Sequence, residues 1–162
     1  MRKASARVRR LALTEELIAL APGPPPDYAD AFELATVEPM PRTAEQWARA
    51  SLEGAPRLLR WFVVLGWRLV LGLRLGPRRS AEHVLGWRLL QASPETALIE
   101  ARSRLMTAQL MFHVEDARFR WMSFVHHRNR VSRLVWVPVG LVHRRIVPFV
   151  MAHAASRATR VA

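Results

Sequence analysis

Two ten-residue segments, 105–114 and 118–127, constrain the fold of this chain more than any other feature. Both alternate along their length with a period of two, as half-buried strands do. Joined through Asp116-Ala117, they place Glu115 opposite Arg118 as a cross-strand ion pair. In this register the predicted inner face carries Met106, Ala108, Leu110, Phe112, Val114, Phe119, Trp121, Ser123, Val125 and His127. The other face, which we expect to be mostly solvated, carries Thr107, Gln109, Met111, His113, Arg120, Met122, Phe124 and His126. Because a slip of one residue would exchange the two faces, their separation predicts an antiparallel hairpin.

Further strands are predicted on either side of the helices. Residues 28–36 read as a first strand whose inner face carries Tyr28, Phe32 and Leu34. Segments 84–91 and 96–100 flank a turn that contains Pro94, where a type I turn accepts proline. These patterns predict a second hairpin and an antiparallel meander.

Two consecutive helices are predicted between the first strand and the meander. Thr43 and Gln46 form a capping box, which starts a helix over 44–53. Pro56 suits the first turn of a second helix, and Gly76-Pro77 is a matching C-terminal stop.

Residues 131–157 are too long and too apolar for a loop and read as a helix interrupted by Pro138 and Pro148. Each proline removes a backbone hydrogen bond, so we expect kinks. At 100° per residue, an inner face about 100° wide is predicted to hold Val135, Pro138, Val139, Val142, Ile146 and Phe149. Arg133 and Arg144 point away from that face.

The domain organisation follows from prolines and length. We expect an N-terminal extension over 1–26 with a possible short helix in 1–21 and a proline-rich linker, one domain over 27–157, and a tail over 158–162. A chain of 162 residues with 51% apolar residues can bury one core without a disulfide or metal. The absence of cysteine excludes disulfides, thiolate zinc sites and cysteine nucleophiles.

The charge is strongly basic and uneven. The chain has 25 basic and 13 acidic residues, a net charge of +12. Residues 1–53 carry 7 basic and 8 acidic groups, so the remaining 18 and 5 give 54–162 a net +13. Such a surface attracts phosphate or anionic membranes, although arginine content also follows genome composition.

The positions of four arginines determine how we interpret the apolar segment 58–75. Arg57, Arg60, Arg68 and Arg74 share an arc of about 120° on a helical projection. We interpret this arc as one solvated stripe on a mostly buried helix, with a membrane-surface helix as the alternative. A spanning helix is disfavoured because it would hold charges near its centre.

No targeting segment is predicted at the N-terminus. Residues 1–21 begin with basic residues, but Glu15 and Glu16 interrupt the apolar core that a signal peptide needs. We therefore expect a cytoplasmic protein.

Residues suited to catalysis or metal binding form no recognisable motif. The six histidines make no HExxH motif and no helical i, i+4 pair, so we predict no metal site and no cofactor. No glycine-rich phosphate loop occurs. A nucleophilic triad would need an acid beside His127, and none is expected there. Ser123 and His127 point inward, toward a ligand or toward backbone and water. We assign no catalytic residue and favour a non-enzymatic protein.

A nucleic-acid surface is one interpretation of the outer sheet face. Arg118, Arg120 and Arg128 lie there with Phe124 and His126, which could stack on bases. We favour a solvated face over this interpretation because the two look alike in sequence.

The predicted order is one strand, two helices, an antiparallel meander and a long C-terminal helix. In this order, and in "H-x-N-R-x-S-R-L" from His127 to Leu134 followed by "V-H-R-R-I-V-P" from Val142 to Pro148, the chain resembles the START and polyketide-cyclase-like (SRPBCC) superfamily, and within it an uncharacterised group of small bacterial proteins. The resemblance covers about residues 27–157. It implies an α+β helix-grip fold, a curved antiparallel sheet wrapped around the long helix, with an apolar cavity between them. The arginine content and the N-terminal extension depart from the superfamily pattern.

The function predicted from the resemblance and the inner face is non-catalytic binding of a hydrophobic small molecule, lipid-like or polyketide-like. The predicted pocket residues are Phe32, Leu34, Ala108, Leu110, Phe112, Trp121, Ser123, Val125, His127, Val135, Val139, Val142 and Ile146. The alternative is a basic interaction module at an anionic membrane surface or nucleic acid. The ligand's identity and the oligomeric state stay open at this point.

Overall fold

A computed structural model describes residues 7–36 and 42–158. These residues form one open antiparallel sheet in the order β1-β2-β8-β7-β6-β5-β4-β3. The strands are β1 (Arg7–Arg10), β2 (Tyr28–Ala35), β3 (Arg79–Ser80), β4 (His83–Val84), β5 (Trp87–Ala92), β6 (Thr96–Arg102), β7 (Met106–Glu115) and β8 (Arg118–His127). The helices are α1 (Glu15–Ala19), α2 (Ala44–Leu52), α3 (Arg57–Leu69) and α4 (Arg130–Ala158). The predicted α+β class is confirmed, and the sheet with its long C-terminal helix is consistent with a helix-grip arrangement.

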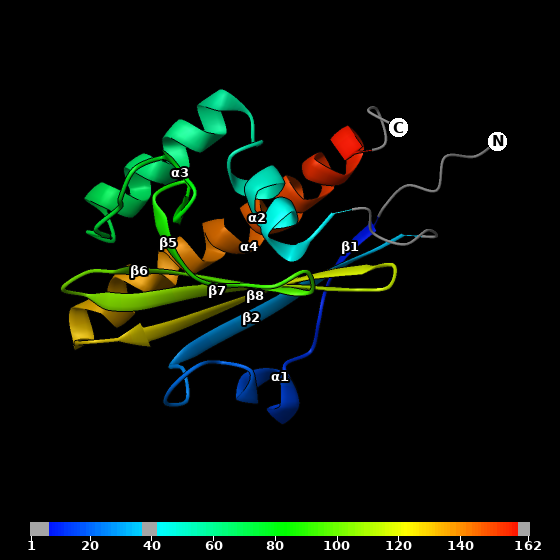
Figure 1. Ribbon diagram of the computed structural model, residues 1–162. Helices are drawn as coiled ribbons and strands as arrows, with labels where there is room; N and C mark the ends of the chain where they lie inside the picture. The colour runs from blue at the N-terminus through cyan, green and yellow to red at the C-terminus, as the bar shows by residue number, and fades with distance from the viewer. Residues whose placement is uncertain (1–6, 37–41, 159–162) are drawn as a thin grey trace.

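The helices are distributed unequally over the two faces of the sheet. Helices α2, α3 and α4 lie on one side of it, and the short α1 lies on the other (Figure 1). We call the side under α2, α3 and α4 the inner face.

The predicted β7–β8 register is confirmed. Glu115 lies opposite Arg118 in the strand pairing, which continues to Met106 and His127. The carboxylate of Glu115 forms its ion pair with Arg120, at 3.4 Å, where the sequence predicted Arg118. Alternation of side chains fixed this register, because any odd shift would have moved Phe112 out of the core. Strand β2 adds to the other edge of β8 and places Asp30 directly opposite Ser123.

The N-terminal residues complete the sheet. Strand β1 pairs with β2, which the sequence analysis did not predict, and α1 begins after Thr14, whose side chain caps the helix. The segment from Leu11 to Ala21 therefore folds with the domain. Residues 1–6 of the predicted extension and residues 159–162 of the predicted tail lie outside the described residues.

The outer sheet face is not mostly solvated, and that prediction was wrong. Met122 and Phe124 are fully buried there, in a small cluster with Ala31. Leu11 and Leu17 pack on this cluster. The N-terminal segment therefore covers the outer face of the sheet. The alternation in β7 and β8 could not predict this contact, because the covering residues lie elsewhere in the chain.

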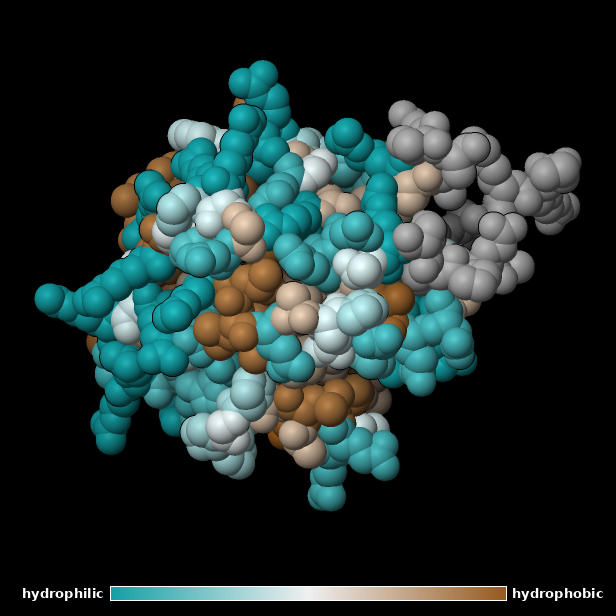
Figure 2. Space-filling view, in the orientation of Figure 1, coloured by the Kyte–Doolittle hydropathy of each residue, from teal (hydrophilic) through white to brown (hydrophobic). Residues whose placement is uncertain are grey.

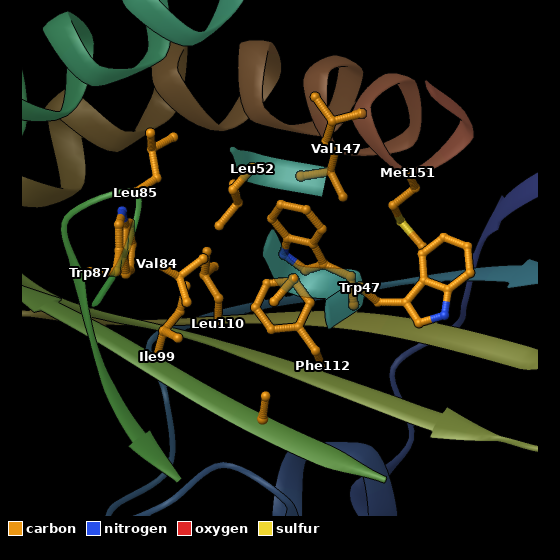
Figure 3. Packing of buried hydrophobic residues seen from close by; sticks show 14 of the residues in the cluster. Trp47, Leu52, Val84, Leu85, Trp87, Ile99, Leu110, Phe112, Val147 and Met151 are labelled. Atoms are coloured by element: carbon orange, nitrogen blue, oxygen red, sulfur yellow. The ribbon is translucent and has the colours of Figure 1, made fainter. Parts of the chain in front are cut away.

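Helix α2 closes one end of the inner face. The predicted capping box is present, since Thr43 Oγ1 accepts from Gln46 N and Gln46 Oε1 accepts from Thr43 N. Trp47 stacks on Phe119 with ring centroids 4.9 Å apart, and Phe112 lies beside Phe119. In Figure 3, Trp47 and Phe112 lie at the centre of the core between sheet and helices.

Helix α3 differs from its prediction in length and burial. It ends at Leu69, before the left-handed Gly72, so Arg74 lies beyond it and donates its backbone N–H to Arg102. Val64 is its single buried residue, so the predicted mostly buried helix with one solvated stripe is wrong. Periodicity identified a helix but could not tell which neighbours would cover it.

The predicted strand over 84–91 is split. Leu85 and Gly86 both have positive φ and form a two-residue turn, with Val84 paired to Trp87 across it. This geometry is that of a tight hairpin and separates β4 from β5.

Helix α4 runs without interruption through Pro138 and Pro148, contrary to the predicted break. Pro138 and Leu134 are exposed, so water can hydrate the carbonyl that the proline leaves unpaired. Its buried face lies roughly 130° further round than predicted. The buried residues are Ser132, Trp136, Gly140, Val147, Val150, Met151, Ala154 and Ala155.

Apolar residues occur on all sides of α4, so the helical projection could not identify which side is buried. By length and composition α4 is long and apolar enough to cross a membrane, and no other described helix is. In the structure it packs against the sheet, with Val147 and Met151 pointing toward it (Figure 3).

Candidate ligand-binding site

A cavity of about 490 Å³ lies between the inner face of the sheet and helices α3 and α4. We call it the α3–α4 cavity. Its sheet wall is formed by the side chains of Leu85, Trp87, Ala108, Leu110, Trp121, Ser123 and Val125. Its α4 wall is formed by Trp136, Pro138, Val139, Val142, His143, Ile146, Val147 and Val150. The volume is that of a small-molecule site.

The cavity exists because small and large residues alternate on the inner face. The large side chains of Phe112 and Trp121 fill the space above one part of the sheet. The small side chains of Ala108 and Ser123 leave space above the neighbouring part. Helix α3 meets the sheet through Trp67, which packs edge-on against Trp87 with ring centroids 5.2 Å apart. The two indoles hold that contact, and the space beside them stays open.

A buried polar cluster lies at the sheet wall. Asp30 is fully buried and accepts a hydrogen bond of 2.6 Å from Tyr28 OH. His143 Nε2 lies 3.2 Å from Asp30 Oδ2 and 3.1 Å from Ser123 Oγ. Trp121 Nε1 donates to Ser123 Oγ at 3.2 Å. Ser123, Trp121 and His143 also line the cavity, so the cluster presents polar groups to it.

Burial and hydrogen bonding compete at this cluster. Burial alone would raise the pKa of Asp30, but hydrogen bonds from His143, Tyr28 and Ser123 and the charge of a protonated His143 hold it below its ordinary value. Burial, followed by the hydrogen bond to Asp30, raises the pKa of Tyr28. Asp30 therefore stays ionised while Tyr28 stays protonated.

The cluster contains the residue types of a nucleophilic triad in a different geometry. A Ser-His-Asp triad uses one imidazole nitrogen for the serine and the other for the acid. Here Ser123 and Asp30 both approach Nε2 of His143. The arrangement anchors the imidazole and the hydroxyl at the cavity wall and provides no relay between serine and acid.

Three buried donors in the cavity walls have no partner among the described residues. They are Ser51 Oγ, Trp87 Nε1 and Trp136 Nε1, and all three residues line the cavity. An unpaired buried donor costs about 1 to 3 kcal/mol, which a hydrogen-bond acceptor within its reach would offset.

Eight of the thirteen predicted pocket residues line this cavity: Ala108, Leu110, Trp121, Ser123, Val125, Val139, Val142 and Ile146. Phe32, Leu34 and Phe112 are buried in the core instead. Val135 and His127 do not line it either.

His127 is engaged at the end of β8. Its Nδ1 lies 2.7 Å from Ser132 Oγ, and its backbone N–H donates to Asp27 at 2.7 Å. Burial, together with the charge of Arg133, lowers the pKa of His127 against the opposing effect of Asp27. Its contacts fasten the start of α4 to the sheet.

Sequence reasoning did not single out Asp30 and His143. Asp30 has the same parity as Tyr28, Phe32 and Leu34, so strand alternation could have placed it on the inner face. His143 lies on the true inner face of α4, which the helical projection missed.

The described residues of the outer sheet face do not form the aromatic platform that the sequence suggested for nucleic acid. Phe124 is buried, and Arg120 pairs with the buried Glu33 at 2.9 Å and with Glu115. Burial would raise the pKa of Glu33, but Arg120 and Arg9 hold it below its ordinary value. The stacking arrangement considered from sequence is therefore not formed.

Among the described residues no group of three or more His, Asp and Glu is placed to hold a metal ion.

Comparison with known proteins gives one match. Neither a curated protein nor a solved structure matches the chain. A family profile described as "Protein of unknown function (DUF2867)" matches residues 24–150. The matched region runs from the end of the proline-rich segment through β2 and the meander into α4, and so includes Asp30, Ser123 and His143. By this match over most of its length, the chain belongs to the DUF2867 family.

Proposed function

We propose that this protein binds a hydrophobic small molecule in the α3–α4 cavity. The observation that carries the proposal is the cavity itself, about 490 Å³ with almost entirely apolar walls and a few convergent polar groups. The resemblance to the START and polyketide-cyclase-like superfamily supports the same function, and lipid-like or polyketide-like ligands suit such walls.

The polar groups narrow the chemistry of the ligand. The lining residues Ser51, Trp87 and Trp136 each hold an unpaired donor, and Arg60, whose Nη1 donates to the Glu53 carbonyl, lines the same cavity. Within 7–36 and 42–158, no acidic residue lines it. A mostly apolar molecule that carries carbonyl, hydroxyl or carboxylate oxygens fits this set better than a pure hydrocarbon.

Binding without catalysis is the form of the proposal that the geometry favours. His143 Nε2 faces both Ser123 and Asp30, so the cluster is arranged to orient a ligand oxygen. We place the activity in the cytoplasm, as the sequence predicts.

The test uses N-phenylnaphthylamine, an apolar fluorescent amine, with the full chain. Ala108→Phe and Val139→Phe each fill the cavity from a different wall, and we expect each to weaken probe binding by about tenfold or more, because the added ring occupies the probe's space. Ala19→Phe, an exposed position on α1 across the sheet, is the matched control. Native mass spectrometry of gently purified protein then identifies any retained ligand.

Denaturation midpoints establish that each variant is folded. Unchanged probe affinity in both folded cavity variants would show that the cavity does not bind apolar molecules. A loss in Ala19→Phe equal to that in the cavity variants would show that the probe binds elsewhere.

A further inference from the structure

The outer surfaces of α3 and α4 expose an unusual amount of apolar side chain. On α3, Leu58 is 84% exposed, Trp61 61% and Leu69 74%. On the cavity side of α4, Val131 is 57% exposed, and Phe149 and Val142 are also exposed. Figure 2 shows hydrophobic side chains among hydrophilic ones at the left edge of the molecule, where α3 lies.

Part of this exposed apolar surface also lines the α3–α4 cavity. Phe62, Leu65 and Leu69 of α3 and Val142 of α4 are exposed and also line the cavity. The apolar surface is therefore continuous with the cavity wall. We call it the α3–α4 surface.

On a helical projection, Leu58, Trp61, Phe62, Leu65 and Leu69 fall within an arc of about 100°. Arg57 and Arg68, both exposed, lie beside Trp61 at the edge of this arc. Aromatic and leucine side chains flanked by arginine are the composition of helices that lie in a membrane interface.

The charge around the surface has one sign. Helix α3 contains Arg57, Arg60 and Arg68, and helix α4 contains Arg130, Arg133, Arg144, Arg145 and Arg157. Residues 54–81 and 117–162 contain no aspartate or glutamate. A partner that is complementary to this surface therefore combines negative charge with an apolar region.

A second copy of the chain satisfies only half of that requirement. A two-fold interface would place arginines of one copy against arginines of the other, with no acidic residue on either helix to pair with them. Nucleic acid supplies charge but offers no apolar layer to a ridge such as Leu58, Trp61 and Leu69. An anionic bilayer supplies both.

We propose that the α3–α4 surface docks on an anionic lipid bilayer, with Leu58 and Trp61 inserted among the acyl chains and the flanking arginines on the headgroups. The cavity opening then faces the lipid. An apolar ligand could then pass between bilayer and cavity without crossing water, and this transfer step rests on the proposed function. Docking of the surface on the bilayer is independent of the proposed function.

The experiment is cosedimentation of the full chain with two kinds of vesicle, one of pure phosphatidylcholine and one of equimolar phosphatidylcholine and phosphatidylglycerol. We expect binding to the anionic vesicles, weakening as salt is raised, and little binding to the neutral ones. Leu58→Gln with Trp61→Gln should lower the partition coefficient by about tenfold or more. Arg57→Gln with Arg68→Gln should lower it by about tenfold.

Two control pairs match these changes on the far side of the sheet. Leu13→Gln with Leu20→Gln removes exposed apolar residues near α1, and Arg88→Gln with Arg118→Gln removes the same charge from the sheet. Neither control should lower vesicle binding as strongly as its partner.

Probe binding separates docking from ligand binding. Leu58 and Trp61 do not line the cavity, so their variant should bind N-phenylnaphthylamine with wild-type affinity. Docking with no probe binding would support this inference and contradict the proposed function. The inference is overturned if anionic vesicles bind no protein, or if the controls weaken binding as much as the α3 variants. A stable dimer that the Leu58 and Trp61 changes dissociate, with no vesicle binding, would assign the surface to a second copy.

Discussion

Helices α2 and α3 follow one another in the chain and lie over the same sheet, yet they are packed in opposite ways. Five of the nine residues of α2 are buried, and Trp47 stacks on Phe119. Of the thirteen residues of α3 one is buried; Leu59 and Trp67 pack against the core, and much of the rest of the helix faces the cavity or solvent. One end of the inner face is thus a close-packed core and the other is hollow. The difference teaches that the helix over the hollow end contributes little to stability and is free to contribute to binding.

The largest expected effect tests the packed end. Trp47→Ala removes a fully buried indole that contacts Phe119, and we expect a loss of about 3 to 5 kcal/mol in the free energy of unfolding. The Leu58→Gln and Trp61→Gln pair on α3 should change it by less than about 0.5 kcal/mol per residue. Urea denaturation measures both. Equal losses in the two regions would contradict the contrast drawn between them.

A smaller effect tests the polar cluster between the two ends. Asp30→Asn removes a buried charge that Tyr28 and His143 contact, and we expect about 2 kcal/mol of destabilisation at neutral pH. Because the pKa of Asp30 is lowered on folding, its stabilisation is present above the unfolded value of about 3.9 and is lost as pH falls through the folded value. Unfolding curves of wild type and variant should therefore converge below about pH 4. A difference that stays constant with pH would show that the carboxylate charge is not the cause.

The smallest effect tests the fastening of α4 beside the hollow end. The pKa of His127 is lowered on folding, so protonation favours the unfolded state as pH falls below the unfolded value of about 6.5. His127→Gln should reduce the loss of stability between neutral and mildly acidic pH and leave N-phenylnaphthylamine affinity unchanged, since His127 does not line the cavity. Thermal unfolding across this pH range measures the first effect. A steeper pH dependence in the variant would contradict the assignment.

The sequence by itself determined the local structure. Alternation in 105–127 specified the β7–β8 register, because the two faces of a strand cannot be exchanged without burying charge. Thr43 and Gln46 specified the start of α2, because a capping box satisfies backbone groups within one turn. Strand parity also placed Ala108, Trp121 and Ser123 on the inner face.

The tertiary structure alone decided which faces are covered. Apolar residues occur on every side of helix α4, so its rotation depends on the sheet and on the contact of His143 with Asp30, residues 113 positions apart. Helix α3 exposes Leu58 and Trp61 because no part of the described chain packs over that side of the helix. The outer face of β8 is buried because α1 and the chain around it fold over it. A local pattern records how apolar residues are spaced along one element, whereas burial depends on what the rest of the chain brings against it.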